Sequence, residues 1–138
     1  MKKIIIFLSL FIFTCNIQAK EFTKVERIKH MRLLTSSLHK IQEGLTGTCQ
    51  TCVEDGVDEL QNNLSVLDSL EIKDFLPKEQ AYAHKFAQKM AHNLKIYSNA
   101  LKDAWREKKH FEAIDMYGLT INQCVSCHLR IRDWEKLK

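Results

Sequence analysis

Apolar residues recur at steps of three and four along most of this chain, and this spacing constrains the fold more than any other feature. The longest series comprises Val25, Ile28, Met31, Leu34, Leu38, Ile41 and Leu45. Such steps match the period of an α-helix and not that of a strand. Gly44 and Gly47 are expected to end this first helix. With only 4 Gly and 1 Pro in 138 residues, the sequence predicts an all-α fold.

Three more stretches show the same spacing, at about residues 53–67, 83–104 and 111–137. Pro77 lies between the second and third stretches and suits the first position of a helix. Four amphipathic helices with short connections favour an antiparallel four-helix bundle. The apolar face of the last helix comprises Phe111, Ile114, Gly118, Ile121, Val125 and further apolar residues to Leu137.

The first 19 residues differ from this helical region. Two lysines precede an apolar run at residues 4–13, and Ala19 supplies a small residue at a cleavage position. This layout is typical of a secretory signal peptide, and the run is too short to span a bilayer comfortably. We therefore predict a cleaved signal peptide at residues 1–19 and one helical domain at residues 20–138.

Export predicts a periplasmic protein without stable membrane insertion after processing. Two alternatives stay open: a retained membrane anchor, and a lipoprotein attached through Cys15, although residues 12–14 match a lipobox poorly. Of the 21 Lys and Arg and 17 Asp and Glu residues, only Lys2 and Lys3 lie in the signal peptide, so the processed chain is close to neutral. Nucleic acid is not expected as a partner, because phosphate binding requires a concentrated basic face.

Residues 124–128 read Cys-Val-Ser-Cys-His, the attachment motif of c-type haem. Two thiols three positions apart can add to the two vinyl groups of one porphyrin, and the imidazole that follows can then coordinate the iron. An exported, all-helical chain is a suitable context for this motif. We therefore predict one covalent haem c attached through Cys124 and Cys127, with His128 as the proximal iron ligand.

A second Cys-x-x-Cys pair, Cys49 and Cys52, lies between the first two helical stretches. Val53 stands where a haem motif would need histidine, so we predict a local disulfide that acts as a structural clip or as a redox-responsive pair. A nonstandard haem site or a metal contact at Cys49 and Cys52 stays open, and so do two other interpretations of the cysteines. A thioredoxin-like pair at Cys124 and Cys127 requires a βαβ setting that this sequence does not predict. A zinc site made of both pairs would leave His128 unexplained.

The motif near the end of a four-helix chain resembles the cytochrome c′ family of four-helix-bundle c-type cytochromes, including its Met-ligated low-spin members. In that family the motif lies in the last helix, and a basic residue typically follows the histidine by four positions, where this chain has Arg132. The segment from His30 to Leu45 is also similar to the first helix of the Met-ligated members. The likeness covers roughly residues 25–135 and implies a proximal haem contact for Arg132.

The resemblance also implies that the first helix covers the opposite side of the haem, where Met31 is the expected distal ligand. A thioether can bind iron, and it raises the reduction potential relative to a second imidazole. Two alternatives stay open. Met31 is ordinary core filler, which is the commoner fate of a methionine on a buried stripe, or the adjacent His30 is the ligand.

Iron held by two protein side chains has no open position, so the implied function is electron transfer between redox partner proteins, and not enzymatic catalysis. If Met31 is not a ligand, the resemblance implies a five-coordinate cytochrome c′ that binds nitric oxide or carbon monoxide. A haem-free protein that exchanges disulfides through Cys49 and Cys52 is a third hypothesis. Homodimers are common in this fold, and an exposed face of the first two helices could serve as the interface.

Overall fold

The computed structural model describes residues 22–68 and 72–131, so the predicted signal peptide lies outside the described residues. These residues form five α-helices and one 3-10 helix, and no strand occurs among them. In chain order the elements are α1 (Lys24–Thr46), α2 (Gln50–Asp68), α3 (Ile72–Phe75), the 3-10 helix η1 (Lys78–Ala83), α4 (His84–Arg106) and α5 (His110–Ile131). The prediction of an all-α fold is confirmed for this part of the chain.

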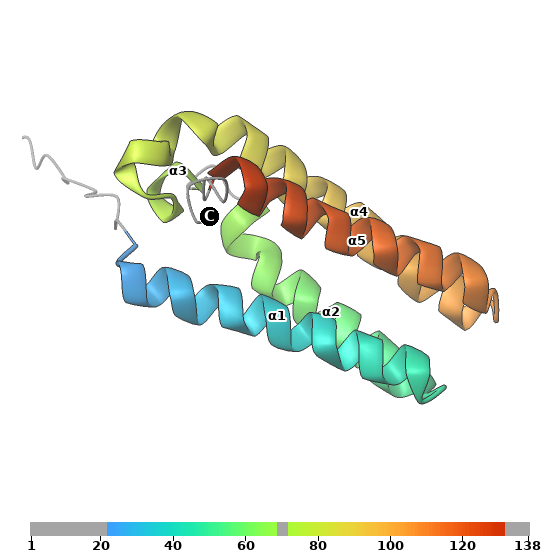
Figure 1. Ribbon diagram of the computed structural model, residues 1–138. Helices are drawn as coiled ribbons and strands as arrows, with labels where there is room; N and C mark the ends of the chain where they lie inside the picture. The colour runs from blue at the N-terminus through green and yellow to red at the C-terminus, as the bar shows by residue number, and fades with distance from the viewer. Residues whose placement is uncertain (1–21, 69–71, 132–138) are drawn as a thin grey trace, which may run out of the picture.

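The four long helices form two side-by-side pairs (Figure 1). α2 turns back along α1, α5 turns back along α4, and contacts between α2 and α4 join the pairs. α3 and η1 lie at the end of the molecule where α2 leads into α4 (Figure 1). This arrangement leaves α1 and α5 as the outer members, one in each pair.

One apolar core runs between the two pairs, and its fully buried side chains include Ile41 of α1, Leu60 of α2 and Leu101 of α4. A smaller apolar cluster lies near α3 and the start of α4 and comprises Ile72, Leu76, Ala83, Ala87 and Ile131. Burial of these apolar side chains is the main driving force for docking the helices. The larger core positions the helices, and the smaller cluster positions α3 beside them.

α1 and α2 approach each other closely at two glycines. A Cβ atom added to Gly44 would lie 2.7 Å from the backbone nitrogen of Val53, and one added to Gly56 would lie 2.9 Å from that of Ile41. Gly44 therefore does not end α1, as the sequence predicted, but lies buried inside it. The helix continues to Thr46. Gly44 allows α2 to approach α1 closely and does not form a turn.

The connection between α2 and α4 also differs from the prediction. Pro77 does not open a long α-helix; it precedes η1, and its carbonyl accepts a hydrogen bond from the backbone N–H of Gln80 at 2.8 Å. The α-helical hydrogen-bond pattern begins only at His84. Before Pro77, α3 buries Ile72 and Phe75, so the connection contributes apolar side chains to the interior.

The buried face of α5 differs from the predicted one. Phe111 is 86% exposed, and Ile114, Gly118 and Val125 are exposed as well. The buried residues of α5 are Ala113, Thr120 and Ile131. Apolar residues occur on both faces of α5, so the spacing alone could not select the inner one. Thr120 tolerates burial because its hydroxyl donates to the carbonyl of Met116 at 2.8 Å.

The first turns of α1 also depart from the predicted buried stripe, because Val25 is 75% exposed and Ile28 is 41% exposed. Burial of the α1 stripe becomes continuous only from Leu34 onward.

Among the described helices, none has the length and apolar character needed to cross a membrane.

Candidate haem site

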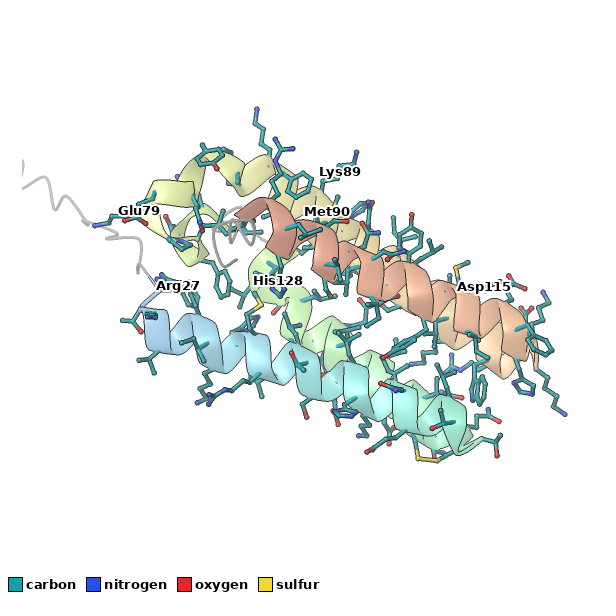
Figure 2. The ribbon with its side chains drawn as sticks, in the orientation of Figure 1. Arg27, Glu79, Lys89, Met90, Asp115 and His128 are labelled. Atoms are coloured by element: carbon teal, nitrogen blue, oxygen red, sulfur yellow. A yellow bond between two sulfur atoms is a disulfide. The ribbon has the colours of Figure 1, made fainter. Side chains whose placement is uncertain are left out.

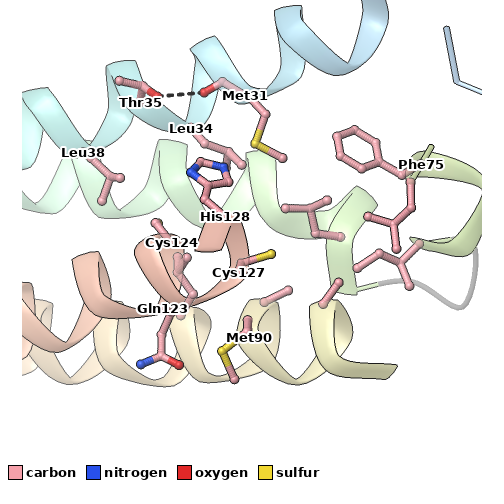
Figure 3. A pocket seen from close by; sticks show the side chains of 16 residues that line it. Met31, Leu34, Thr35, Leu38, Phe75, Met90, Gln123, Cys124, Cys127 and His128 are labelled. Atoms are coloured by element: carbon pink, nitrogen blue, oxygen red, sulfur yellow. Dashed lines mark hydrogen bonds between the residues drawn. The ribbon is translucent and has the colours of Figure 1, made fainter. Parts of the chain in front are cut away.

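α5 presents Cys124, Cys127 and His128 on one side, because positions i, i+3 and i+4 of an α-helix share a face. All three side chains line the same pocket (Figure 3). Met31 lines it from α1 on the opposite side. The structure therefore brings together the three motif residues and the expected distal ligand, which are far apart in the sequence.

The pocket holds a cavity of about 100 Å³ and opens to solvent at its mouth. Its walls are mainly apolar and come from every α-helix. Besides the motif and Met31, they include Leu34, Leu38, Leu67, Ile72, Phe75, Leu76, Met90 and Leu94. Such a lining suits a flat hydrophobic ligand.

His128 and Met31 face each other across this pocket. Figure 3 shows the imidazole of His128 directed toward α1, beside Leu34, with the thioether of Met31 directed into the same space. Met31 is half-buried and packs against the main core. Its backbone carbonyl accepts a hydrogen bond from the Thr35 hydroxyl at 2.9 Å, within α1. The imidazole and the thioether thus come from the two outer helices.

Neither motif cysteine is joined to another cysteine, and both are half-buried. Burial raises the pKa of the Cys124 thiol to about 11, with a smaller contribution from the neighbouring Cys127. Burial also raises the pKa of the Cys127 thiol. Both groups are therefore neutral thiols at physiological pH in the folded chain. Cys124 packs against the main core and Cys127 against the smaller cluster.

His30, the alternative distal ligand, does not line the pocket. Its ring packs edge-on against Phe75, with ring centroids 5.4 Å apart. Burial lowers the pKa of His30, and a hydrogen bond with the backbone of Asn63 opposes this shift only in part. Its Nε2 atom is buried without a hydrogen-bond partner among the described residues. In this structure His30 thus supports a pocket wall, while Met31 reaches the pocket itself.

The donor set fits a c-type haem. Two thiols and one imidazole lie on one helix face, a thioether lies across an apolar pocket, and none of the described residues that line that pocket is acidic. In residues 22–68 and 72–131, no three His, Cys, Asp or Glu side chains gather closely enough to hold a metal ion by themselves. A haem iron needs only one or two protein ligands, because the porphyrin nitrogens supply the others.

Cys49 and Cys52 lie at the turn between α1 and α2 and are joined by a disulfide with an S–S distance of 2.01 Å. Figure 2 shows this bond at the end of the molecule opposite to His128. A zinc site made of both cysteine pairs is therefore not formed. The thioredoxin-like interpretation also lacks its βαβ setting in the described part of the chain.

Sequence reasoning overlooked one wall of the pocket, the short helix α3. Ile72, Phe75 and Leu76 are buried and line the pocket from this side. Phe75 follows Ile72 by three positions and Leu76 by four, which matches a single helical turn. This spacing was the signal in the sequence that could have predicted α3. Arg132, the expected proximal contact, lies outside the described residues.

Comparison of the chain with protein-family models, with curated proteins and with solved structures finds no significant match. Function is therefore inferred from the geometry and chemistry of the pocket, because a fold alone does not define an activity.

Proposed function

We propose that this chain is an exported single-haem c-type cytochrome that transfers electrons between redox partner proteins of the periplasm. Cys124 and Cys127 would attach the haem covalently, His128 would be the proximal iron ligand, and Met31 the distal one. The fold would be an antiparallel four-helix bundle of the cytochrome c′ kind, in which α1, α2, α4 and α5 are the four long helices.

One observation carries this proposal: the three residues of the Cys-x-x-Cys-His motif and Met31 line a single apolar pocket. The motif alone is five residues long, and short patterns occur by chance. A chance match would have no reason to face an apolar pocket lined by every α-helix of the described residues. It would also have no reason to face a thioether contributed by another helix.

Each residue has a distinct task in this proposal. A haem bound here would supply one-electron redox chemistry. The two cysteines would prevent loss of the cofactor, and His128 and Met31 would both bind its iron, which would leave no open position for a substrate. Met31 would favour the reduced state more than a second imidazole would. Leu34, Leu38 and Met90 would give the haem apolar walls, which would reduce the local dielectric.

The test is to produce the protein together with a haem-attachment system, denature it in acid, and extract it with organic solvent. We expect the haem to stay with the polypeptide at one haem per chain. Cys124→Ser and Cys127→Ser should each sharply reduce the yield of haem-containing protein. Ser126→Ala is the matched control, because Ser126 is exposed on the same turn and should leave the yield unchanged. Extraction of all the haem into the solvent would contradict the proposal.

A second function is favoured by the composition of the wall beside Met31. Leu34 and Leu38 lie on the same face of α1 and line the same pocket. If Met31 does not bind the iron, the iron has an open position beside this apolar wall. An apolar distal wall suits nitric oxide or carbon monoxide. Rapid binding of carbon monoxide by the unmutated ferrous protein, together with a high-spin spectrum, would favour this gas-binding function over electron transfer.

A further inference from the structure

Within residues 22–68 and 72–131, the disulfide between Cys49 and Cys52 is the cysteine group that the proposed haem function does not use. It lies in the short segment from Gly47 to the first turn of α2, and both cysteines are half-buried, so neither sulfur is enclosed in the core. Either the disulfide stabilises the turn, or the turn is stable without the disulfide and the pair is free to react.

Backbone hydrogen bonds already close the turn. The N–H of Gly47 donates to the carbonyl of Glu43 at 2.8 Å, and the N–H of Cys49 donates to that of Gly44 at 2.9 Å. The N–H of Val53 then donates to the carbonyl of Cys49 at 3.2 Å, which starts α2. Cys49 is thus tied by its backbone to both helices, and none of these bonds involves a sulfur atom.

Packing also fixes the two helices without the disulfide. Gly44 lies directly against Val53, and Gly56 lies directly against Ile41, a fully buried core residue. The disulfide closes a loop with a sequence separation of only 3. In the chain-entropy account such a short loop removes little freedom from the unfolded chain, so it contributes little to stability. A structural clip at this position would be largely redundant.

The sulfur of Cys49, in contrast, has surroundings that stabilise a thiolate. It lies at the N-terminus of α2, where the helix dipole and the unpaired N–H groups of the first turn favour negative charge. The backbone N–H of Cys52 donates to Cys49 Sγ at 3.3 Å. The hydroxyl of Thr51, an exposed residue, lies 3.6 Å from the same sulfur. When the disulfide opens, both groups can donate to the Cys49 thiolate.

We propose that Cys49 and Cys52 form a redox-active pair that exchanges with a dithiol on a partner protein. A thiolate of the partner attacks Cys52 Sγ, the bond between the two sulfurs breaks, and Cys49 leaves as the thiolate. The second thiol of the partner, after losing its proton, attacks the mixed disulfide and releases Cys52, which takes up a proton. Two electrons have then moved to this chain, and the dithiol of the partner has become a disulfide.

The first test equilibrates the mature protein with mixtures of reduced and oxidised glutathione. The mixtures are quenched with acid and alkylated, and peptide mapping then counts modified Cys49 and Cys52 separately from Cys124 and Cys127. We expect the pair to convert between disulfide and dithiol while circular dichroism shows an unchanged helix content. A disulfide that stays oxidised until the chain unfolds, or a chain that unfolds on reduction, would identify a structural clip and overturn the proposal.

The second test compares two single variants, each of which leaves one thiol of the pair, and peptide mapping separates its reaction from that of Cys124 and Cys127. At pH 7, Cys52→Ser, which retains Cys49, should react with iodoacetamide faster than Cys49→Ser. The alkylation rate should rise about threefold for each unit by which the helix N-terminus lowers the pKa of the Cys49 thiol. The larger fraction of thiolate outweighs the weaker nucleophilicity of that thiolate. Adding Thr51→Val to Cys52→Ser should slow the reaction, and Gln50→Ala is the matched control on the same exposed turn. Equal rates for the two thiols would refute the assigned roles. Neither test depends on haem, so a failed haem proposal would be recognised separately.

Discussion

Adjacent residues of α1 have different surroundings, although both carry side chains that can bind iron. Met31 lines the pocket, whereas the ring of His30 packs against Phe75 behind the pocket wall. Consecutive positions on a helix are separated by about 100°, so only one of two neighbours can face a given cavity. The helical stripe placed Met31 on the inner side from sequence alone, and its ligation of iron remains a proposal.

Substitution of Met31 by Ala tests this residue in the haem-containing protein. The unmutated protein should be low-spin and show the weak red absorption band of ferric iron bound by a thioether. Met31→Ala should abolish that band and allow carbon monoxide to bind the ferrous protein. Because Met31 is only half-buried, the loss of stability should be about 2 kcal/mol or less, at the low end of truncations to Ala.

A control and a contrary outcome accompany this substitution. Thr35→Val, one helical turn further along α1, changes a residue that lines the pocket without removing a thioether. It should leave the red absorption band in place. A Met31→Ala spectrum identical to that of the unmutated protein would show that Met31 is core filler.

Cys124 makes the stability of the haem-free chain dependent on pH. Its thiol has a pKa of about 11 in the folded chain against an ordinary value of 9.0, because burial disfavours the thiolate. The folded chain therefore keeps a proton that the unfolded chain loses, and the free energy of unfolding falls as the pH rises from about 9 to about 11. Urea unfolding at several pH values should show a shallower decline for Cys124→Ala than for the unmutated chain. Equal declines would contradict the assigned burial.

At the scale of the elements, the sequence predicted the existence of the long helices more reliably than the faces they bury. In α1 the apolar stripe from Leu34 onward is the buried face. In α5 apolar residues surround the helix, and the inner face carries the small residues Ala113 and Thr120 beside α4. That selection depends on which neighbour packs there, and periodicity within one helix contains no information about the neighbour.

The glycines of the long helices offer a direct test of this packing. Gly44→Ala and Gly56→Ala should each destabilise the protein by about 1–3 kcal/mol, as is typical of overpacked sites. The new Cβ atoms would meet the backbone of Val53 or Ile41 at less than 3 Å, and backbone cannot move aside cheaply.

Gly118→Ala is the matched contrast in α5. Nothing lies within 4 Å of a Cβ atom built at this exposed position, so Ala should stabilise the protein by about 0.5–1 kcal/mol through its helix propensity. Thermal and urea unfolding of the three variants would measure these changes. Destabilisation by Gly118→Ala would indicate a close contact at this position that the isolated chain lacks.

At the scale of the whole molecule, the candidate haem pocket could be predicted only in part. The Cys-x-x-Cys-His motif and the Met31 stripe identified one side of the pocket and its opposite wall. The role of α3 was overlooked, because a single helical turn between residue 72 and Pro77 gives only a weak spacing signal and no repeated pattern. Its position beside the pocket depends on contacts with α2 and α4 that only the folded chain supplies.

The position of α1 and α5 as outer helices has a consequence for the order of assembly. Each long pair, α1 with α2 and α4 with α5, joins neighbours in sequence, and such local contacts form quickly. The pocket instead requires residues from both ends of the domain. The hydrogen bond from the Tyr117 hydroxyl to the carbonyl of Leu38 at 3.3 Å likewise joins α5 to α1. We expect the pairs to gain protection in pulsed hydrogen exchange before α1 docks near α5. Under the proposed haem function, Cys124 and Cys127 would stay within reach of an attachment enzyme until that last step, so the slowest contact would set the time available for maturation.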